Sequence, residues 1–299
     1  MALSGLQIFQ LLPKTNCKDC GCPTCLAFAM KVATKTASIE DCPDASDEAK
    51  TKLGAAAEPP IRTIKVGAGA AAIELGGETV SYRHEKTFLR PTAIAIRLAD
   101  TDDVADKMGQ ITAYEVQRVG ERLAVDMIAL KAVGGDFVGA AKTIAASWAG
   151  PVLLDCTDVA LLRGAAEALR GRQPILRPGS SDDLAGLVEL AKSTKSVLVL
   201  TGASAAELND LGERAAAAGW RELLLELDTR STSQRLQQQT IIRRAALKGT
   251  KGLGYPVLMS LDGEDVDNSG VIAICKYASV LVLNELDDAH LYPLLTLRQ

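Results

Sequence analysis

Eight short aliphatic runs recur along the chain from residue 91 onward, and each is followed by a stretch with helical periodicity. Their starts lie about 22 to 33 residues apart, which is the length of one strand–helix unit. The runs are apolar at nearly every position, so both faces of the sheet are expected to be buried and its strands to be parallel. The predicted strands are Thr92–Leu98, Val125–Val133, Pro151–Cys156, Pro174–Arg177, Ser196–Thr201, Glu222–Asp228, Tyr255–Ser260 and Ser279–Asn284.

Eight such units in about 200 residues favour a closed (β/α)8 barrel, the TIM barrel, over an open doubly wound sheet. An open sheet that binds a dinucleotide would carry the fingerprint G-x-G-x-x-G where its first helix begins. The glycines that come nearest to this pattern fall in a predicted hairpin and are given no cofactor role; they are Gly67, Gly69, Gly76 and Gly77.

The region before the barrel has a different sequence pattern, which predicts a small, mostly helical domain followed by a β-hairpin. The chain is therefore assigned to the α/β class, with these two parts preceding the barrel. The segment A-A-A-E-P-P, Ala55–Pro60, has the composition of a linker. The predicted divisions are 1–57 for the small domain, 58–90 for the linker and hairpin, and 91–299 for the TIM barrel.

Two helices are expected in the small domain. Ser4 can cap the first, which Pro13 stops, and the second is predicted over 23–38. The hairpin is expected to pair Ile61–Val66 with Ile73–Tyr82 and to close the bottom of the barrel.

Five of the seven cysteines lie between residues 17 and 42, so their distribution indicates a site. The spacing C-x2-C-x4-C-x16-C is formed by Cys17, Cys20, Cys25 and Cys42. A 4Fe–4S cubane needs four thiolates on four different irons, so three close ones wrap around it and a distant fourth holds the other side. Gly21 permits a tight turn between ligands. These four cysteines are therefore the predicted ligands of a 4Fe–4S cluster.

Alternatives remain for this segment. Cys22 can replace Cys20 or Cys25 in a different ligand spacing. A structural zinc site usually pairs two C-x2-C knuckles, and only one clear pair is present. Disulfide bonds are disfavoured where thiols stay reduced. The isolated Cys156 and Cys275 lie in or beside apolar runs and are expected to be small core residues.

Composition narrows the functional classes. The net charge of -4 and the scattered positive charges argue against a nucleic-acid partner. No window approaches the roughly 18–20 continuous apolar residues of a membrane span. The apolar start of the chain is short, lacks a basic leader and ends at Pro13, so no signal peptide is expected and the protein is predicted to be cytoplasmic.

Catalytic side chains of barrel enzymes sit at the C-terminal ends of the strands. Asp155 and Asp228 are the pair most suited to acid–base chemistry. No histidine and no second metal-ligand cluster joins them, so a reaction of the barrel itself is not favoured, and these polar side chains are expected to satisfy loop backbone groups. The full set of candidates is Asp155, Arg177, Thr201, Asp228, Ser260 and Asn284.

The N-terminal sequence resembles a known family. The run L-S-G-L-Q-I-F-Q-L-L-P-K-T-N-C-K-D-C-G-C-P-T-C-L-A-F-A-M, the later D-C-P at 41–43 and the predicted barrel are similar to the large (gamma) subunit of the corrinoid iron–sulfur protein. Members of that family are methyl carriers of the reductive acetyl-CoA (Wood–Ljungdahl) pathway. The resemblance covers the whole chain, and the cysteine segment is its most specific part.

The resemblance implies a 4Fe–4S domain, a TIM barrel and a C-terminal module that binds a cobalamin-type corrinoid. The family's cluster ligands correspond to Cys17, Cys20, Cys25 and Cys42. Their implied role is to pass one electron to cobalt that has slipped to inactive Co(II), restoring Co(I). The chain would then be a methyl-carrier and electron-transfer component of a corrinoid-dependent methyltransferase system, and not a stand-alone enzyme.

The resemblance also implies partners. The first is the small (delta) subunit, with which the family forms a heterodimer. A methyltetrahydrofolate:corrinoid methyltransferase supplies the methyl group, and acetyl-CoA synthase receives it. The fourth is a reductive activator.

The sequence departs from the family pattern near its end. The chain ends at Gln299, just after the eighth predicted strand and one helix, so the corrinoid is expected to be held by a module absent from this chain. Asp288-Ala-His290 opens like the cobalt-binding motif D-x-H-x-x-G, but Pro293 stands in place of the glycine, so His290 is interpreted as an ordinary histidine. His84 is expected to be a surface residue without partners.

Two other functions are open at this stage. One is a ferredoxin-like electron-transfer subunit without cobalt chemistry, for which a barrel of this size is an unusual attachment. The other is an interaction module whose N-terminus is stabilised by zinc and docks the barrel onto a partner.

Overall fold

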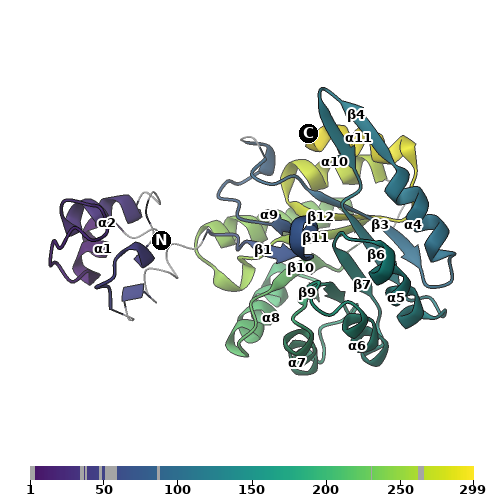
Figure 1. Ribbon diagram of the computed structural model, residues 1–299, viewed down its shortest axis with the longest axis horizontal. Coiled ribbons are helices and arrows are strands. Elements are labelled where there is room, and N and C mark those ends of the chain that lie inside the picture. Colours follow the sequence, from purple (N-terminus) through teal and green to yellow (C-terminus); the bar gives the residue numbers. More distant parts are fainter. Residues whose placement is uncertain are drawn as a thin grey trace. The chain divides into compact units, whose positions relative to one another are not determined.

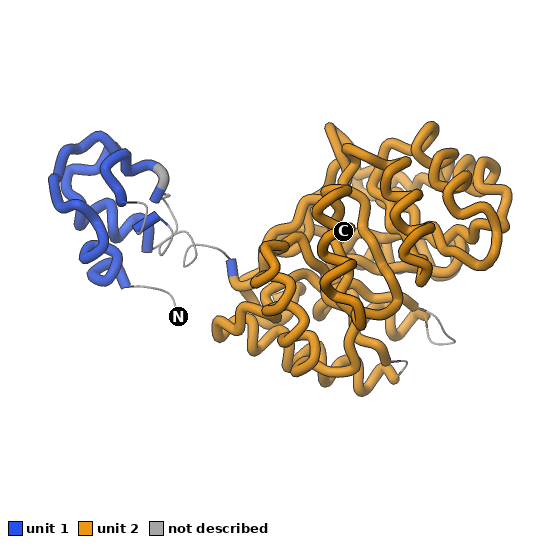
Figure 2. Tube along the Cα trace, turned by 90° about the horizontal axis from the view of Figure 1, so that it is seen from below, with its two compact units in different colours: residues 1–59 blue, residues 60–299 orange. Residues whose placement is uncertain are grey.

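The computed structural model describes residues 4–33, 37, 39–46, 49–50, 59–85, 88–229, 231–261 and 266–299. The chain consists of two compact units, residues 1–59 and residues 60–299 (Figure 2). Most of the predicted linker, residues 55–58, lies outside the described residues.

The first unit contains helices α1 (Gly5–Leu11) and α2 (Cys25–Ala33) and a short 3-10 turn at Ile39–Asp41. Ser4 caps α1 as predicted. Its hydroxyl accepts the backbone N–H of Gln7 at 3.3 Å, while the Gln7 side chain accepts the backbone N–H of Ser4 at 2.9 Å, so two N–H groups at the helix start are satisfied.

Helix α2 begins at Cys25, two residues later than predicted, because the hydroxyl of Thr24 accepts the N–H of Ala27 at 3.1 Å in the manner of a helix cap. Residues 34–36 and 38 of the predicted helix lie outside the described residues. The two helices pack around a small apolar core to which three cysteines belong: Ile8, Leu12, Cys22, Cys25, Phe28, Ala29, Val32, Ile39, Cys42 and Ala45.

The second unit is the predicted barrel. Its eight parallel strands pair in chain order, and the last pairs with the first, so the sheet is closed. Figure 1 shows the helices surrounding these strands. The strands are β3 (Ala93–Ala99), β6 (Met127–Lys131), β7 (Val152–Asp155), β8 (Ile175–Arg177), β9 (Val197–Gly202), β10 (Leu223–Leu227), β11 (Val257–Leu261) and β12 (Ala278–Leu283). Each lies within about two residues of its predicted position at either end.

One helix follows each barrel strand, directly or after a short insertion. They are α4 (Val104–Ala113), α5 (Phe137–Ser147), α6 (Val159–Ala168), α7 (Leu184–Thr194), α8 (Ala205–Ala217), α9 (Thr232–Leu247), α10 (Val266–Lys276) and α11 (Asp288–Arg298). None of the helices in the described parts of the chain is both long and apolar enough to cross a membrane.

An antiparallel hairpin that was not predicted lies between α4 and β6. Its strands are β4 (Glu115–Arg118) and β5 (Glu121–Ala124), and the connecting Val119 and Gly120 both have positive φ, as in the two-residue turns that suit hairpins. Both strands are largely exposed and polar, so they lack the aliphatic run that identified the other strands.

The barrel interior is filled by aliphatic side chains from alternate positions of each strand, and the intervening positions pack outward against the helices. The interior residues from the barrel strands are Ala93, Ala95, Met127, Ala129, Leu153, Ile175, Val197, Val199, Leu224, Leu258, Val280 and Val282. The barrel is therefore a packed core and not a pore.

The predicted hairpin closes the N-terminal end of the barrel. It consists of β1 (Ile64–Val66) and β2 (Ile73–Leu75), and its buried Ile64, Val66 and Leu75 belong to the interior core. The backbone around it bonds to residues that directly precede strands, with Gly67 N–H donating to the Gln173 carbonyl at 3.4 Å.

The second hairpin strand is shorter than the predicted Ile73–Tyr82. It ends at Leu75 because Gly76 and Gly77 both have positive φ, which ends the extended conformation. A Cβ atom on Gly76 would lie 2.3 Å from the Arg62 carbonyl oxygen, so only glycine fits this close approach.

A buried ion pair ties the segment after the hairpin to the barrel. Arg83 Nε donates to Glu78 Oε1 at 2.8 Å, and both side chains are almost fully buried. The same guanidinium donates to the Ala278 carbonyl at 2.6 Å, to the Thr92 hydroxyl and to the Arg90 carbonyl. One charged group therefore joins the hairpin segment to the starts of β3 and β12.

We expect Arg83→Ala to lower the free energy of unfolding of the barrel unit by about 3–5 kcal/mol, because it leaves the Glu78 carboxylate buried without its main partner. Urea unfolding followed by tryptophan fluorescence measures this, since both tryptophans, Trp148 and Trp220, lie in the barrel unit. Arg170→Ala, which removes an exposed pair with Glu167, is the control and should change stability by about 0.5 kcal/mol or less. Equal effects of the two substitutions would contradict the role of the buried pair.

Candidate functional site

The loop between α1 and α2 is built from repeated left-handed backbone turns. Lys14, Asn16, Lys18 and Gly21 all have φ between 51° and 71°. Left-handed residues are uncommon outside glycine, and a loop with several of them reverses direction within a few residues. The N–H of Gly21 donates to the Lys18 carbonyl at 2.8 Å and closes one of these turns between the first two predicted ligands.

Asn16 connects this loop to the start of α2. Its side-chain Oδ1 accepts the backbone N–H of Cys25 at 2.8 Å, and its own backbone N–H donates to Cys25 Sγ at 3.4 Å. The loop is therefore held against the first residue of the helix at the position of the third predicted ligand.

The fourth predicted ligand lies in the neighbourhood of the other three. Burial raises the pKa of the Cys42 thiol, a backbone hydrogen bond at Asp44 lowers it, and the nearby Cys20, Cys17 and Cys25 raise it again. Cys25 and Cys42 are buried, Cys20 is half-buried and Cys17 is exposed.

Cys22 is buried in the same small core of the first unit as Cys25 and Cys42, so burial does not distinguish it from the predicted ligands. All of these cysteines are free thiols in the structure.

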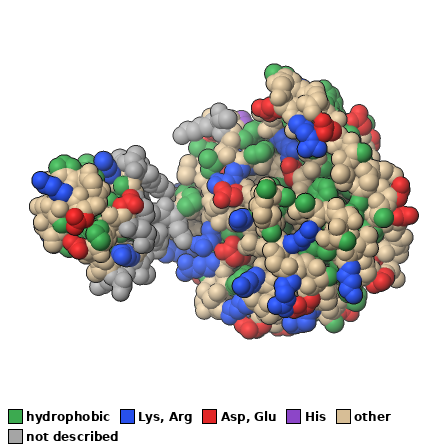
Figure 3. Space-filling view, viewed as in Figure 1, with side chains coloured by type: hydrophobic (Ala, Val, Ile, Leu, Met, Phe, Trp, Pro, Cys, Tyr) green, Lys and Arg blue, Asp and Glu red, His purple; other side chains and the backbone are tan. Residues whose placement is uncertain are grey.

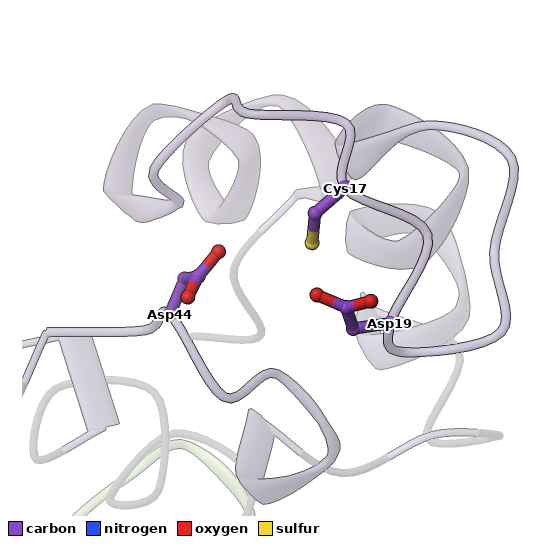
Figure 4. Close-up of side chains that lie close together, drawn as sticks. All are labelled: Cys17, Asp19 and Asp44. Carbon is purple, nitrogen blue, oxygen red and sulfur yellow. The ribbon is translucent and has the colours of Figure 1, made fainter.

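Two carboxylates lie beside the exposed cysteine. Figure 4 shows the side chains of Cys17, Asp19 and Asp44 pointing toward one another, and their ligand atoms all lie within 4.8 Å of each other. No three cysteine sulfurs of the described residues form so compact a group.

The second predicted region is the C-terminal mouth of the barrel, which a ring of polar side chains closes. On every barrel strand the inward-facing series of aliphatic residues ends with a polar residue, two positions after the last aliphatic one. The ring consists of Arg97, Lys131, Asp155, Arg177, Thr201, Glu226, Ser260 and Asn284.

Within the ring, charges of opposite sign are paired. Arg177 donates to both carboxylate oxygens of Glu226, at 2.7 and 3.0 Å, and to Asp155 Oδ2 at 2.8 Å. Burial lowers the pKa of the Arg177 guanidinium, but Glu226 and Asp155 raise it by more, so the net shift is upward. Such bidentate pairs hold both partners in their charged forms.

Arg97 bridges the rest of the ring. Its guanidinium donates to the Ser260 hydroxyl at 2.5 Å and to the Asn284 side chain, and it lies 3.9 Å from Asp155. Both carboxylates of the ring, Asp155 and Glu226, therefore lie against an arginine.

Five of the six predicted barrel candidates belong to this ring, and the sixth does not. Asp228 is exposed beyond the end of β10, so the predicted acid–base pair of Asp155 and Asp228 does not form. Glu226, two residues earlier in the same strand, takes the inward position instead. The missed members are Arg97, Lys131 and Glu226, although a single Glu inside the run L-L-L-E-L was a visible signal.

The histidines and the isolated cysteines have structural surroundings. His290 Nδ1 lies 2.7 Å from Asp267 Oδ1 on the neighbouring α10, an ordinary surface pair that raises the His290 pKa. His84 is exposed as predicted, but it has partners: its Nδ1 lies 2.7 Å from the Cys275 carbonyl and its ring stacks on Tyr82. Cys156 is a buried core residue as predicted, and Cys275 is half-buried.

On the face shown in Figure 3, basic and acidic side chains of the barrel unit are interspersed and not gathered by sign. The fold and the cysteine site together define a class of protein: a small cysteine-rich unit joined to a TIM barrel.

Comparison with protein families identifies the group. Residues 63–299 match the family described as "CO dehydrogenase/acetyl-CoA synthase delta subunit", and residues 12–43 match the family described as "Putative Fe-S cluster". The chain belongs to the first of these families, and the second match supports an iron–sulfur cofactor in the N-terminal unit.

Individual relatives agree. The chain is 36% identical over 309 residues to the corrinoid/iron–sulfur protein large subunit of Moorella thermoacetica, across 100% of this chain and 69% of the relative. It is 30% identical to the gamma subunit of the acetyl-CoA decarbonylase/synthase complex of Methanothermobacter thermautotrophicus, across 100% of this chain and 70% of the relative. These matches confirm the resemblance inferred from the cysteine segment and place the chain in a family of acetyl-CoA pathway subunits.

Solved structures share the barrel. Dihydropteroate synthase from Thermus thermophilus superposes with a TM-score of 0.56 at 15% identity, over 79% of this chain and 98% of that one. The enzyme from Yersinia pestis gives 0.54 at 14% identity, over 79% and 97%. At this identity the similarity describes the fold alone.

We expect Glu226→Gln to lower the free energy of unfolding by about 2–3 kcal/mol, because the neutral amide keeps only one acceptor oxygen for Arg177 and turns an NH2 donor toward it in place of the other. Urea unfolding followed by tryptophan fluorescence checks this. Asp228→Asn is the matched control on the same strand end and should change stability by about 0.5 kcal/mol or less, since Asp228 is exposed. A larger effect of Asp228→Asn than of Glu226→Gln would contradict the assignment of the ring.

Proposed function

We propose that this chain is a subunit of a corrinoid methyl carrier and that Cys17, Cys20, Cys25 and Cys42 hold its 4Fe–4S cluster. The observation that carries the proposal is the match of residues 12–43 to an iron–sulfur cluster family, in a chain of the acetyl-CoA pathway family whose Cys42 lies near Cys17, Cys20 and Cys25. The corrinoid itself is inferred from the Moorella relative, a corrinoid/iron–sulfur protein.

The donor set fits such a cluster. Four thiolates are what a cubane requires, and no histidine or carboxylate has to complete the set. Cys22 is left out because the spacing C-x2-C-x4-C-x16-C is complete without it. The two backbone N–H groups that reach ligand sulfurs, from Asn16 to Cys25 and from Asp44 to Cys42, are the kind of contact that stabilises a negatively charged cluster.

When bound, such a cluster supplies one electron at a time, which matches the proposed return of inactive Co(II) to Co(I).

The cysteines differ in their exposure to solvent. Buried Cys25 and Cys42 shield one side of the site from water, and exposed Cys17 marks the side that a redox partner can approach. A site of reduced thiols is consistent with the cytoplasmic location that we also propose.

The barrel is proposed to serve as a scaffold. Its interior is packed, its lower end is closed by the β1–β2 hairpin and its mouth is closed by paired charges. The proposed partners are those of the family: a small (delta) subunit, a methyltetrahydrofolate:corrinoid methyltransferase, acetyl-CoA synthase and a reductive activator. The methyl group would pass from the methyltransferase to acetyl-CoA synthase by way of the corrinoid.

The ligand assignment predicts which cysteines matter. After anaerobic reconstitution with iron and sulfide, we expect about four irons per chain and expect Cys17→Ser, Cys20→Ser, Cys25→Ser and Cys42→Ser each to lose most of them. Cys22→Ser is the matched control from the same segment and should keep the full content. Chemical iron and sulfide assays with the absorption spectrum measure both. Loss of iron in Cys22→Ser with retention in Cys20→Ser or Cys25→Ser would overturn the assignment.

The carrier role predicts cobalt. In the native assembly, purified anaerobically, we expect a corrinoid together with the cluster, and we expect a low-potential reductant to convert its Co(II) to Co(I). The same assembly with Cys42→Ser should lose most of this conversion, which absorption spectroscopy follows. An assembly with an intact cluster and no cobalt would support the ferredoxin-like alternative, and zinc in place of iron would contradict both redox functions.

A further inference from the structure

The contact between Asn16 and Cys25 is reciprocal, and it involves a side chain that the proposed function has not used. Asn16 Oδ1 accepts the N–H of Cys25 at 2.8 Å, and the N–H of Asn16 donates to the sulfur of Cys25 at 3.4 Å. A proposed ligand is thus held at both its backbone and its sulfur by one residue from the loop, nine positions earlier in the chain.

The local structure explains why asparagine suits this position. Asn16 has φ of 51°, in the left-handed region where asparagine is several-fold enriched over most other residues. Cys25 is the first residue of α2, so its N–H has no partner within the helix and needs one from outside. The Asn16 side chain supplies that acceptor and in doing so orients the Asn16 N–H toward the Cys25 sulfur.

We propose that Asn16 is a positioning residue that raises the reduction potential of the cluster site and slows loss of iron from it. An N–H that donates to a thiolate sulfur stabilises negative charge, and the reduced state of a cluster carries one more negative charge than the oxidised state. The bond therefore favours the reduced state. This inference rests on the proposed ligand role of Cys25.

The contact of Asn16 is more open to testing than the second one of its kind. Asp44 also provides a backbone hydrogen bond, to Cys42, but that donor has no side-chain clamp that a substitution can remove. At Asn16 the clamp is Oδ1, and glycine can replace the residue without strain because it adopts positive φ freely. Asn16→Gly therefore removes the clamp and leaves the backbone turn possible.

The experiment compares three variants of the whole chain, reconstituted anaerobically. In Asn16→Gly we expect the ratio of reduced to oxidised cluster at a fixed ambient potential to fall about three- to tenfold, where tenfold corresponds to 59 mV for a one-electron couple. Iron release to a chelator should become faster. An electrochemical titration monitored by electron paramagnetic resonance gives the first quantity, and absorbance of the iron–chelator complex gives the second.

Asn16→Asp keeps the acceptor oxygen, so its iron release should match that of the unsubstituted chain, even if Asn16→Gly holds too little cluster for a titration. Thr15→Ala, a neutral change at the exposed neighbouring position, should alter neither quantity. An unchanged potential in Asn16→Gly, or iron release from Asn16→Asp as fast as from Asn16→Gly, would overturn the proposal. Failure of the unsubstituted chain to take up iron would instead contradict the proposed function.

Discussion

The site depends on the convergence of four sulfurs from two segments that α2 separates in the sequence. Three cysteines belong to the loop and the helix start, and the fourth follows the 3-10 turn at Ile39–Asp41. Burial and, to a smaller extent, the nearby Cys20, Cys17 and Cys25 raise the pKa of the Cys42 thiol, and a cationic centre between these residues would offset the repulsion of their thiolates. The left-handed turns at Lys14, Asn16 and Lys18 and the small core around Phe28 hold the segments in place. A binding centre that draws the sulfurs together would add to the stability of this unit.

The barrel unit depends on the packing of its interior and on paired charges at the C-terminal ends of its strands. Aliphatic side chains occupy the interior, the β1–β2 hairpin covers the lower end, and Arg97 and Arg177 neutralise the acidic residues of the mouth. At the mouth, Arg97 donates to Ser260 and Arg177 to Glu226, which fits the scaffold role proposed for the barrel.

Much of the fold was predictable because it follows from local patterns. The eight barrel strands are aliphatic on both faces, and this property alone identified them. The β4–β5 hairpin was not predicted because its strands are exposed and carry charged residues such as Glu115 and Arg122, so they lack the aliphatic pattern of a buried strand. The end of β2 was misplaced because the chain beyond Leu75 stays partly apolar, while the positive φ of Gly76 and Gly77 is a property of the close approach to Arg62. At the N-terminal site, cysteine spacing indicated the ligands. The role of Glu226 depends on which way its side chain faces, and that of Asn16 depends on a left-handed turn. Neither property follows from residue spacing.

Mössbauer spectroscopy of the chain, reconstituted anaerobically with isotopically enriched iron, shows whether these cysteines bind one four-iron cluster. We expect one spectral component typical of a 4Fe–4S cubane that accounts for nearly all the iron and that disappears in Cys42→Ser. A spectrum of isolated iron ions, or a protein that takes up zinc and no iron, would contradict it.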